Sequence, residues 1–116
     1  MVPRTSAWHQ SVMQKFDTVV IGGGAAGIIA AISSKRRGRD VVICEKMPRL
    51  GKKILISGAG RCNISNEDLG EAHYNPGARE LVKNIFSRFG SEEIEKFFNG
   101  LGLMLYSQEG RIFPVT

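Results

Sequence analysis

Two apolar runs in the first half of the chain have the length and composition of buried β-strands, and a segment of helical length separates them. Residues 16–21 and residues 40–45 are rich in β-branched side chains, which is typical of parallel strands covered on both faces. Residues 25–37 predict a helix, and Gly38 is placed to end it. The order strand, helix, strand predicts a right-handed βαβ unit.

Apolar residues in the second half recur at helical spacing in two short segments. Asn75 and Pro76 predict the start of the first helix, and Gly90 its end. Ser91 predicts the N-cap of the second helix. The apolar faces are expected at Leu81, Val82, Ile85, Phe86 and Phe89 in the first helix and at Ile94, Phe97, Phe98 and Leu101 in the second.

Two further segments complete the expected secondary structure. Residues 103–107 and residues 111–115 flank the sequence Gln-Glu-Gly and predict a β-hairpin with a glycine at its bend. Residues 46–66 show no periodic pattern and carry several glycines and basic residues, so we expect a loop there. The fold class predicted is α/β, a Rossmann-like βαβ unit followed by two short helices and a hairpin.

The connection between the first strand and its helix is a glycine-rich turn with the spacing of a dinucleotide-binding site. Gly22 permits the tight turn, Gly24 lets a pyrophosphate approach the backbone, and Gly27 lets the helix pack closely on the strand. The backbone N–H groups at the start of the helix would face the phosphates. An acidic residue at the end of the second strand would accept hydrogen bonds from an adenosine ribose. The candidate residues are Gly22, Gly24, Ala25, Ala26, Gly27 and Glu45.

Charge and composition narrow the classes of partner. The net charge is +5, and half of the 16 basic residues lie within residues 35–53. That segment contains no aromatic side chain to stack on bases, so we expect no nucleic-acid partner. We expect the first of these basic residues to lie at the C-terminal end of the helix, where the helix dipole favours positive charge. The later ones are expected to face an anionic cofactor.

Other classes are disfavoured by what the sequence lacks. No apolar run approaches the roughly 18 residues of a membrane span, and no histidine or cysteine pair has metal-ligand spacing. With only two cysteines the chain is no disulfide scaffold, which favours a cytoplasmic protein. We expect Cys44 to be buried and Cys62 to lie in a polar loop, and residues 1–14 to form a disordered tail.

Residues 51–66, which read GKKILISGAGRCNISN, and residues 110–115, which read GRIFPV, add a more specific signal to the glycine-rich turn. Together they resemble the N-terminal part of the BaiN-type flavoproteins, the aminoacetone-oxidase-like FAD-binding family, from about residue 16 to the last residue. The resemblance implies an FAD-binding domain of the glutathione-reductase-like type. It also implies that a second group of residues lines the rest of the FAD, namely Lys46, Lys52, Gly60, Arg61, Cys62 and Asn63.

The function implied is that of a flavin-dependent oxidoreductase acting on a small molecule, whose catalytic residues the sequence does not identify. FAD is favoured over NAD because a long Gly- and Arg-rich loop, rather than another helix, follows the second strand. The alternatives are an NAD-binding module without catalysis and an inactive fragment of the longer flavoenzyme. We expect residues 15–116 to be the N-terminal part of an FAD-binding domain that is incomplete in this chain. Cys62 is expected to pack or to contact the flavin rather than to react.

Overall fold

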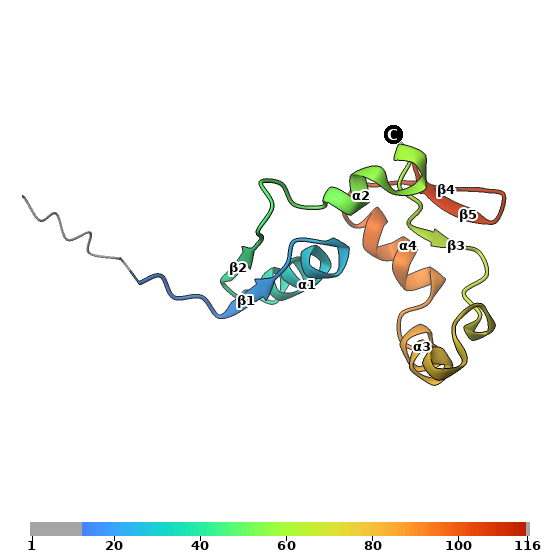
Figure 1. The fold of residues 1–116 in the computed structure, drawn as a ribbon, viewed down its shortest axis with the longest axis horizontal. Helices are drawn as coiled ribbons and strands as arrows, with labels where there is room; N and C mark the ends of the chain where they lie inside the picture. The colour runs from blue at the N-terminus through green and yellow to red at the C-terminus, as the bar shows by residue number, and fades with distance from the viewer. Residues whose placement is uncertain (1–12, 116) are drawn as a thin grey trace, which may run out of the picture. The chain divides into compact units, whose positions relative to one another are not determined.

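The computed structural model describes residues 13–115, which form two compact units divided after Gly51 (Figure 1). Each unit has its own secondary structure and is described by itself. Most of the predicted N-terminal tail, residues 1–12, lies outside the described residues.

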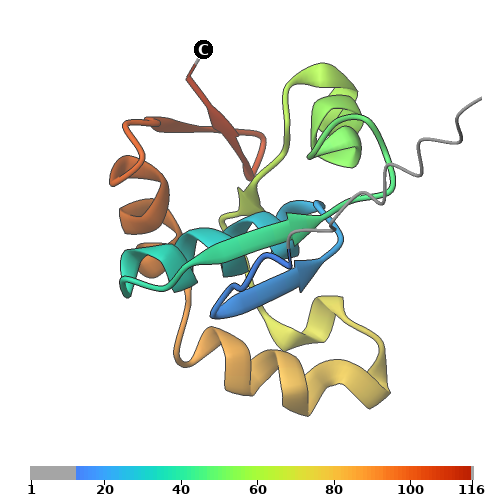
Figure 2. The ribbon, with the colours of Figure 1, turned by 90° about the vertical axis from the view of Figure 1, so that its left-hand side faces the viewer.

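The first unit is a βαβ unit, as predicted. It consists of β1 (Thr18–Ile21), α1 (Ala25–Arg36) and β2 (Val41–Cys44). The two strands are parallel, with Thr18 opposite Val41 and Ile21 opposite Cys44. Helix α1 packs along this pair of strands (Figure 2). The strands are shorter than the apolar runs because the pairing begins and ends inside them.

Helix α1 lies very close to β1 at Gly27. A Cβ atom on Gly27 would lie 2.0 Å from the carbonyl oxygen of Gly22 and 3.2 Å from Cγ1 of Val20. One turn later, Ala31 is also buried and 8% exposed. The helix ends as predicted: Gly38 has a φ of +77° and donates its N–H to the carbonyl of Lys35 at 2.9 Å. Small residues therefore set the distance between helix and strand.

The expectation that residues 16–21 form a buried strand is wrong for the described residues. Side chains alternate along a strand, and α1 packs on the β1–β2 pair from one side. Val19 remains 56% exposed and Ile21 90% exposed. Cys44, which is paired with Ile21, is also exposed, so its predicted burial is wrong.

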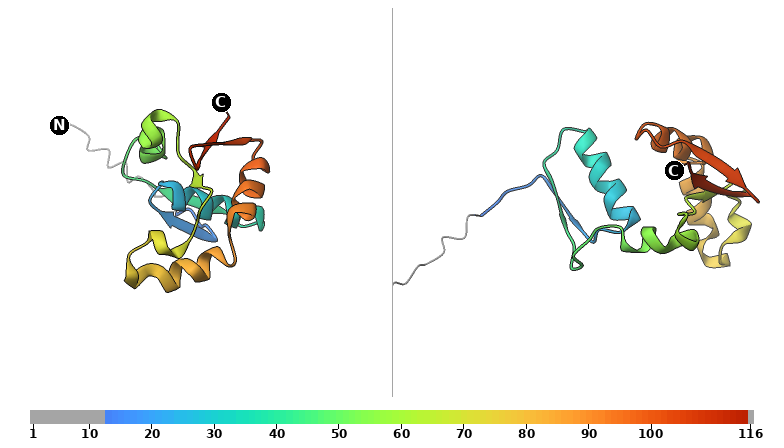
Figure 3. Two further views of the ribbon diagram at one scale, coloured as in Figure 1. Left: turned by 90° about the vertical axis from the view of Figure 1, so that its right-hand side faces the viewer. Right: turned by 90° about the horizontal axis from the view of Figure 1, so that it is seen from above.

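The second unit contains a three-stranded antiparallel sheet in the order β3-β5-β4, together with short helices (Figure 3). Its elements in chain order are α2 (Lys52–Ile56), η1 (Ser57–Gly60), β3 (Ser65–Asn66), η2 (Glu71–His73), η3 (Pro76–Ala78), α3 (Arg79–Phe86), α4 (Ser91–Asn99), β4 (Leu105–Gln108) and β5 (Arg111–Pro114). The predicted loop over residues 46–66 was therefore wrong in part, because α2, η1 and β3 lie within it.

The predicted hairpin is confirmed, with a two-residue bend. Glu109 and Gly110 have φ values of +53° and +73°, the left-handed conformation that tight hairpin turns need. Phe113 on β5 is 2% exposed, and its ring lies 5.8 Å from the ring of Tyr106 on β4. Phe113 is thus the most deeply buried large side chain of the described residues.

The predicted helix starts need correction. Asn75 and Pro76 do begin a helical turn, but it is the short turn η3, whose N-cap Asn75 makes no side-chain capping bond; α3 itself begins at Arg79. Helix α3 ends at Phe86, before Gly90. The N-cap of α4 is Gly90 rather than Ser91, since the N–H of Gly90 is bound by Glu93 Oε2 at 2.9 Å. The Glu93 carboxylate reaches back from the first turn to the N-cap, and Ser91 is the first residue of the helix.

The apolar face predicted for α3 is only partly buried. Val82 is 9% exposed, whereas Leu81 is 63% exposed, Ile85 49% and Phe89 43%. The helical spacing is as predicted, but the described residues bury only the centre of this apolar face.

Prediction: replacing Gly27 by alanine destabilises the first unit. Alanine normally favours a helix interior over glycine, but here its Cβ would overlap the Gly22 carbonyl oxygen. We expect a loss of about 1–3 kcal/mol in the free energy of unfolding, measured by urea denaturation. The control is Gly77→Ala, where a Cβ meets nothing within 4 Å. An equal or higher stability of Gly27→Ala would contradict the close packing.

Candidate functional site

The turn between β1 and α1 is open at the position where a ligand would meet the helix. Gly22 has a φ of +97°, and its N–H binds the carbonyl of Cys44 at 2.8 Å, which ties the turn to β2. Gly24 is the N-cap of α1, and no side chain caps the helix. A Cβ on Gly24 would meet nothing within 4 Å.

This open helix start has the chemistry of an anion site. The first N–H groups of an α-helix have no partner within the helix, and the helix dipole favours negative charge there. Ala25 and Ala26 open α1 without any acidic residue in the first turn. The N–H groups of this turn can therefore bind the oxygens of a phosphate.

Glu45 follows β2 and lies beside the same turn. Its Oε2 accepts a hydrogen bond from the N–H of Gly23 at 2.6 Å, and its Oε1 accepts one from the N–H of Met47 at 2.9 Å. The bond from Met47, followed by that from Gly23, lowers the pKa of the Glu45 carboxyl below its ordinary value of 4.5, and the charge of Lys46 adds to this. A fixed carboxylate of this kind retains lone pairs for two further hydroxyl donors.

Gly23 is a part of the site that the sequence reasoning did not single out. It is buried, and a Cβ there would lie 2.3 Å from Leu50 Cδ2 and 3.3 Å from Glu45 Oε2. Its carbonyl accepts the N–H of Gly51 at 2.7 Å. Its position as the middle glycine of the Gly-Gly-Gly sequence was the available signal. In the fold, Gly23 joins the turn to the segment after β2.

The remaining predicted residues belong mainly to the second unit. Lys46 directly follows Glu45 in the first unit, whereas Lys52 begins α2. Gly60 and Cys62 have φ values of +85° and +58°. The described structure thus places the predicted residues in two groups, one in each unit.

Arg61 and Asn63 hold the Gly60–Asn63 segment against the sheet. Arg61 Nη1 donates to Gln108 Oε1 at 2.8 Å, and its guanidinium carbon lies 4.6 Å from the centre of the Phe113 ring. With its amide oriented to donate, Asn63 Nδ2 lies 2.7 Å from the carbonyl oxygen of Ser65. Both residues therefore position the segment, in addition to any contact with a ligand.

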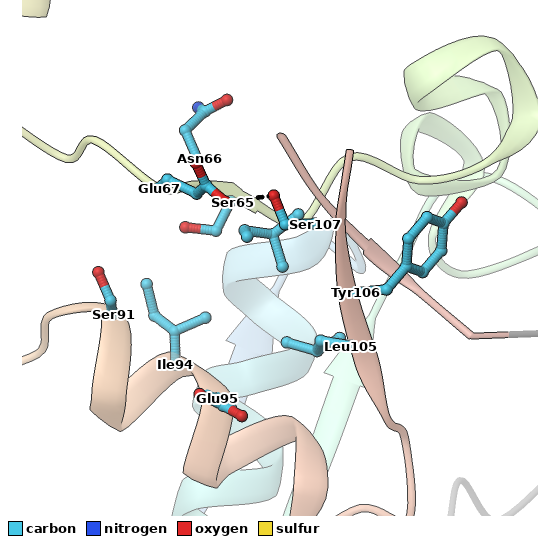
Figure 4. Close-up of a pocket in the computed structure, with 10 residues that line it drawn as sticks. Ser65, Asn66, Glu67, Ser91, Ile94, Glu95, Leu105, Tyr106 and Ser107 are labelled. Atoms are coloured by element: carbon cyan, nitrogen blue, oxygen red, sulfur yellow. Dashed lines mark hydrogen bonds between the residues drawn. The ribbon is translucent and has the colours of Figure 1, made fainter. Parts of the chain in front are cut away.

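The second unit also contains a hollow of about 370 Å³ between α4 and the sheet (Figure 4). Ile94 and Leu105 contribute apolar surface, and Glu67 accepts a hydrogen bond from the hydroxyl of Ser107. The ring of Tyr106 points away from the other side chains (Figure 4). The hollow depends on how the helix meets the sheet, which no local pattern predicts.

Residues 13–115 contain neither a candidate membrane span nor a candidate metal centre. None of their helices has the length and apolar character to cross a membrane. Within the same range, no three His, Cys, Asp or Glu side chains lie together as metal ligands.

The family model described as "HI0933-like protein Rossmann domain" matches residues 16–116. That match includes both the glycine-rich turn and the Gly60–Asn63 segment. The chain belongs to the HI0933-like Rossmann domain family. This confirms the α/β Rossmann fold class, and the relatives below confirm the resemblance to the BaiN-type flavoproteins.

Three curated relatives show how the HI0933-like chain compares with longer proteins. It is 43% identical over 97 residues to the 3-dehydro-bile acid delta(4,6)-reductase of Clostridium scindens, covering 82% of this chain and 24% of that protein. It is 30% identical over 102 residues to the ribosomal RNA dihydrouridine synthase of Escherichia coli, covering 87% of this chain and 26% of that protein. The chain is also 30% identical over 115 residues to the FAD-dependent oxidoreductase dbaF of Emericella nidulans, covering 97% of this chain and 24% of that protein. The HI0933-like chain spans about a quarter of the length of these relatives.

Prediction: the stability of the HI0933-like chain depends on pH through Glu45. Because the folded pKa of Glu45 lies below 4.5, the ionised carboxylate stabilises the fold above pH 4.5, and this contribution is lost as the pH falls through the lower folded value. The stability difference between wild type and Glu45→Gln, from urea denaturation at several pH values, should be constant near neutrality and shrink in acid. Glu80→Gln, on an exposed part of α3, controls for the lost charge. A difference that does not change with pH would refute the assigned bonds.

Proposed function

We propose that this chain forms the FAD-binding Rossmann part of a flavin-dependent oxidoreductase. In this proposal the pyrophosphate lies at the first turn of α1, and the adenosine ribose lies at Glu45. The observation that carries the proposal is the combination of an uncapped helix start, open space at Gly24 and a carboxylate fixed beside the turn. An anion site alone would need only the helix; the neighbouring carboxylate selects a ligand that also presents hydroxyl groups.

The position of Glu45 argues against a cofactor with a phosphate on that ribose. Two backbone N–H groups hold its carboxylate, and its lowered pKa keeps it ionised near neutral pH. A negative charge at this position repels a 2′-phosphate and accepts hydrogen bonds from a 2′-hydroxyl. FAD and NAD both meet this condition, whereas NADP does not.

FAD is preferred over NAD for reasons that lie outside the turn. One of the relatives is named an FAD-dependent oxidoreductase, and another is named a reductase. The segment after β2 continues into α2 and the left-handed stretch around Gly60, which differs from the next strand and helix of a plain NAD-binding repeat. We propose that Lys46, Lys52, Gly60, Arg61, Cys62 and Asn63 line the rest of the FAD.

The chemistry of such an enzyme comes from its cofactor. Bound FAD supplies the acceptance and transfer of electrons or hydride, and the protein supplies position and electrostatics. In this chain the first turn of α1 binds the phosphates, and the Gly22 turn holds that helix start in place. Glu45 orients the adenosine end.

The substrate is proposed to be a small molecule, in a cytoplasmic protein without a nucleic-acid or membrane partner. Two relatives are named ribosomal RNA dihydrouridine synthases, so the expectation about nucleic acid stays a prediction. The alternative function is an NAD-binding module without catalysis. Titration of the chain with FAD and with NAD separates the two, since the module predicts tighter binding of NAD.

Prediction: Gly24→Val abolishes binding of adenosine diphosphate without unfolding the chain. The valine side chain would fill the space that the phosphates need, while its Cβ meets no protein atom within 4 Å. Isothermal titration calorimetry measures the binding, and circular dichroism measures the fold. Gly77→Val, at another open glycine, is the matched control and should bind as wild type does. Unchanged affinity in a folded Gly24→Val protein would exclude the turn as the phosphate site.

Prediction: Glu45→Ala weakens adenosine diphosphate but not inorganic pyrophosphate. Only the nucleoside offers ribose hydroxyls to the carboxylate, so its affinity should fall about tenfold or more, as for the loss of charge-assisted hydrogen bonds. Pyrophosphate should bind equally well or better once a negative charge is gone. If both ligands lose affinity to the same extent, Glu45 shapes the turn and does not bind the ribose.

A further inference from the structure

One face of the three-stranded sheet presents an arginine beside the most buried side chain. Arg111 and Phe113 are two residues apart on β5 and therefore point to the same face. Gln108 and Tyr106 lie directly opposite them on β4, and opposite residues in an antiparallel pair share a face. Figure 4 agrees, since Tyr106 points away from the hollow on the α4 side.

A second arginine reaches the same face from the Gly60–Asn63 segment. Arg61 donates to the amide oxygen of Gln108 at 2.8 Å and lies 4.6 Å over the ring of Phe113. Contact with an aromatic face and a neutral amide fixes the guanidinium without neutralising it. Arg61 and Arg111 are therefore both neighbours of Gln108.

The two arginines line one hollow of about 260 Å³ in the second unit. Its lining consists of Gly58, Ala59, Arg61, Asn63, Arg111 and Phe113. Gly58 and Ala59 have φ values of +56° and +54°, and a Cβ on Gly58 would lie 2.7 Å from the backbone nitrogen of Asn63. The backbone therefore folds tightly around one side of the hollow.

No described residue forms an ion pair with the two arginines of this hollow. Among residues 13–115 the ion pairs are Lys35 with Asp40, His73 with Asp68 and Lys96 with Glu92, and none involves Arg61 or Arg111. The cross-strand partners of Arg111 are the amides Gln108 and Asn66. Arg61 and Arg111 both line the hollow, so their like charges repel each other and favour an anion between them.

We propose that this hollow binds an anionic group, a carboxylate or a phosphate. Both groups match the planar fork of a guanidinium and accept paired hydrogen bonds from it. The carboxylate would come from a small-molecule ligand, and the phosphate from a nucleotide. The hollow lies in the second unit and does not include the turn at Gly24. Arg61 and Asn63 are also among the residues proposed to line the FAD, so a nucleotide phosphate in this hollow rests on the proposed function, whereas a carboxylate does not.

The test follows the side-chain Nε–Hε signals of arginine by NMR in the full chain. Sodium acetate and sodium phosphate are titrated separately at constant ionic strength, with chloride as the balancing anion. We expect saturable shifts of the Arg61 and Arg111 signals. Saturation with phosphate alone supports a phosphate ligand, with acetate alone a carboxylate, and with both an anion site of either kind.

Matched variants decide whether the two arginines act together. Arg61→Gln and Arg111→Gln should each weaken the anion about tenfold or more. Arg111→Lys, which keeps the charge, should bind with intermediate affinity. Arg88→Gln, at an exposed arginine outside the hollow, should bind as wild type does. Both replaced arginines are exposed, and backbone NMR spectra verify the fold. Shifts that do not saturate, or equal weakening by Arg88→Gln, would overturn the proposal.

Discussion

The close contact between α1 and β1 at Gly27 determines where the candidate site can form. A Cβ at that position would lie 2.0 Å from the Gly22 carbonyl oxygen, so any larger residue would push the helix away from the strand. With glycine there, the turn at Gly22 is short and its N–H reaches the carbonyl of Cys44 on β2. The start of α1 is therefore held at the carboxyl ends of both strands, where open α/β sheets bind ligands.

Glu45 connects the turn to the chain after β2. Its carboxylate binds the N–H groups of Gly23 and Met47, and the carbonyl of Gly23 binds Gly51. The same side chain is thus part of the fold and, in the proposed function, a ligand for ribose. In the second unit Phe113 has the corresponding central place, because β4, the Arg61 guanidinium and the Gly58 turn all meet it.

The sequence predicted those features whose signals are local. The strand, turn and helix around Gly22–Gly27 were predicted because glycine positions and β-branched runs act within a few residues. The hairpin was predicted because the Glu109–Gly110 bend interrupts two alternating runs. Burial at Cys44 was predicted wrongly, since an apolar run does not say how many faces of its sheet are covered. The N-cap was placed wrongly at Ser91, because the Glu93 carboxylate binds the N–H of Gly90 and the helix already begins at Ser91.

Long-range features could not be read from the sequence. Strand β3 is two residues long, which is too short for a pattern, and it exists only through pairing with β5. The bond from Arg61 to Gln108 joins residues 47 positions apart, and no spacing rule connects them. The roles of Gly23 and Gly51 also emerge only when the segment after β2 returns to the turn.

A backbone-amide NMR titration of the chain with adenosine diphosphate tests the proposed nucleotide site most directly. We expect saturable shifts concentrated at Gly23, Gly24, Ala25 and Ala26, and at the residues around Glu45. Their dependence on nucleotide concentration should give one common dissociation constant. Saturable shifts that lie elsewhere, with these amides unchanged, would contradict the assignment of the α1 start as the nucleotide site.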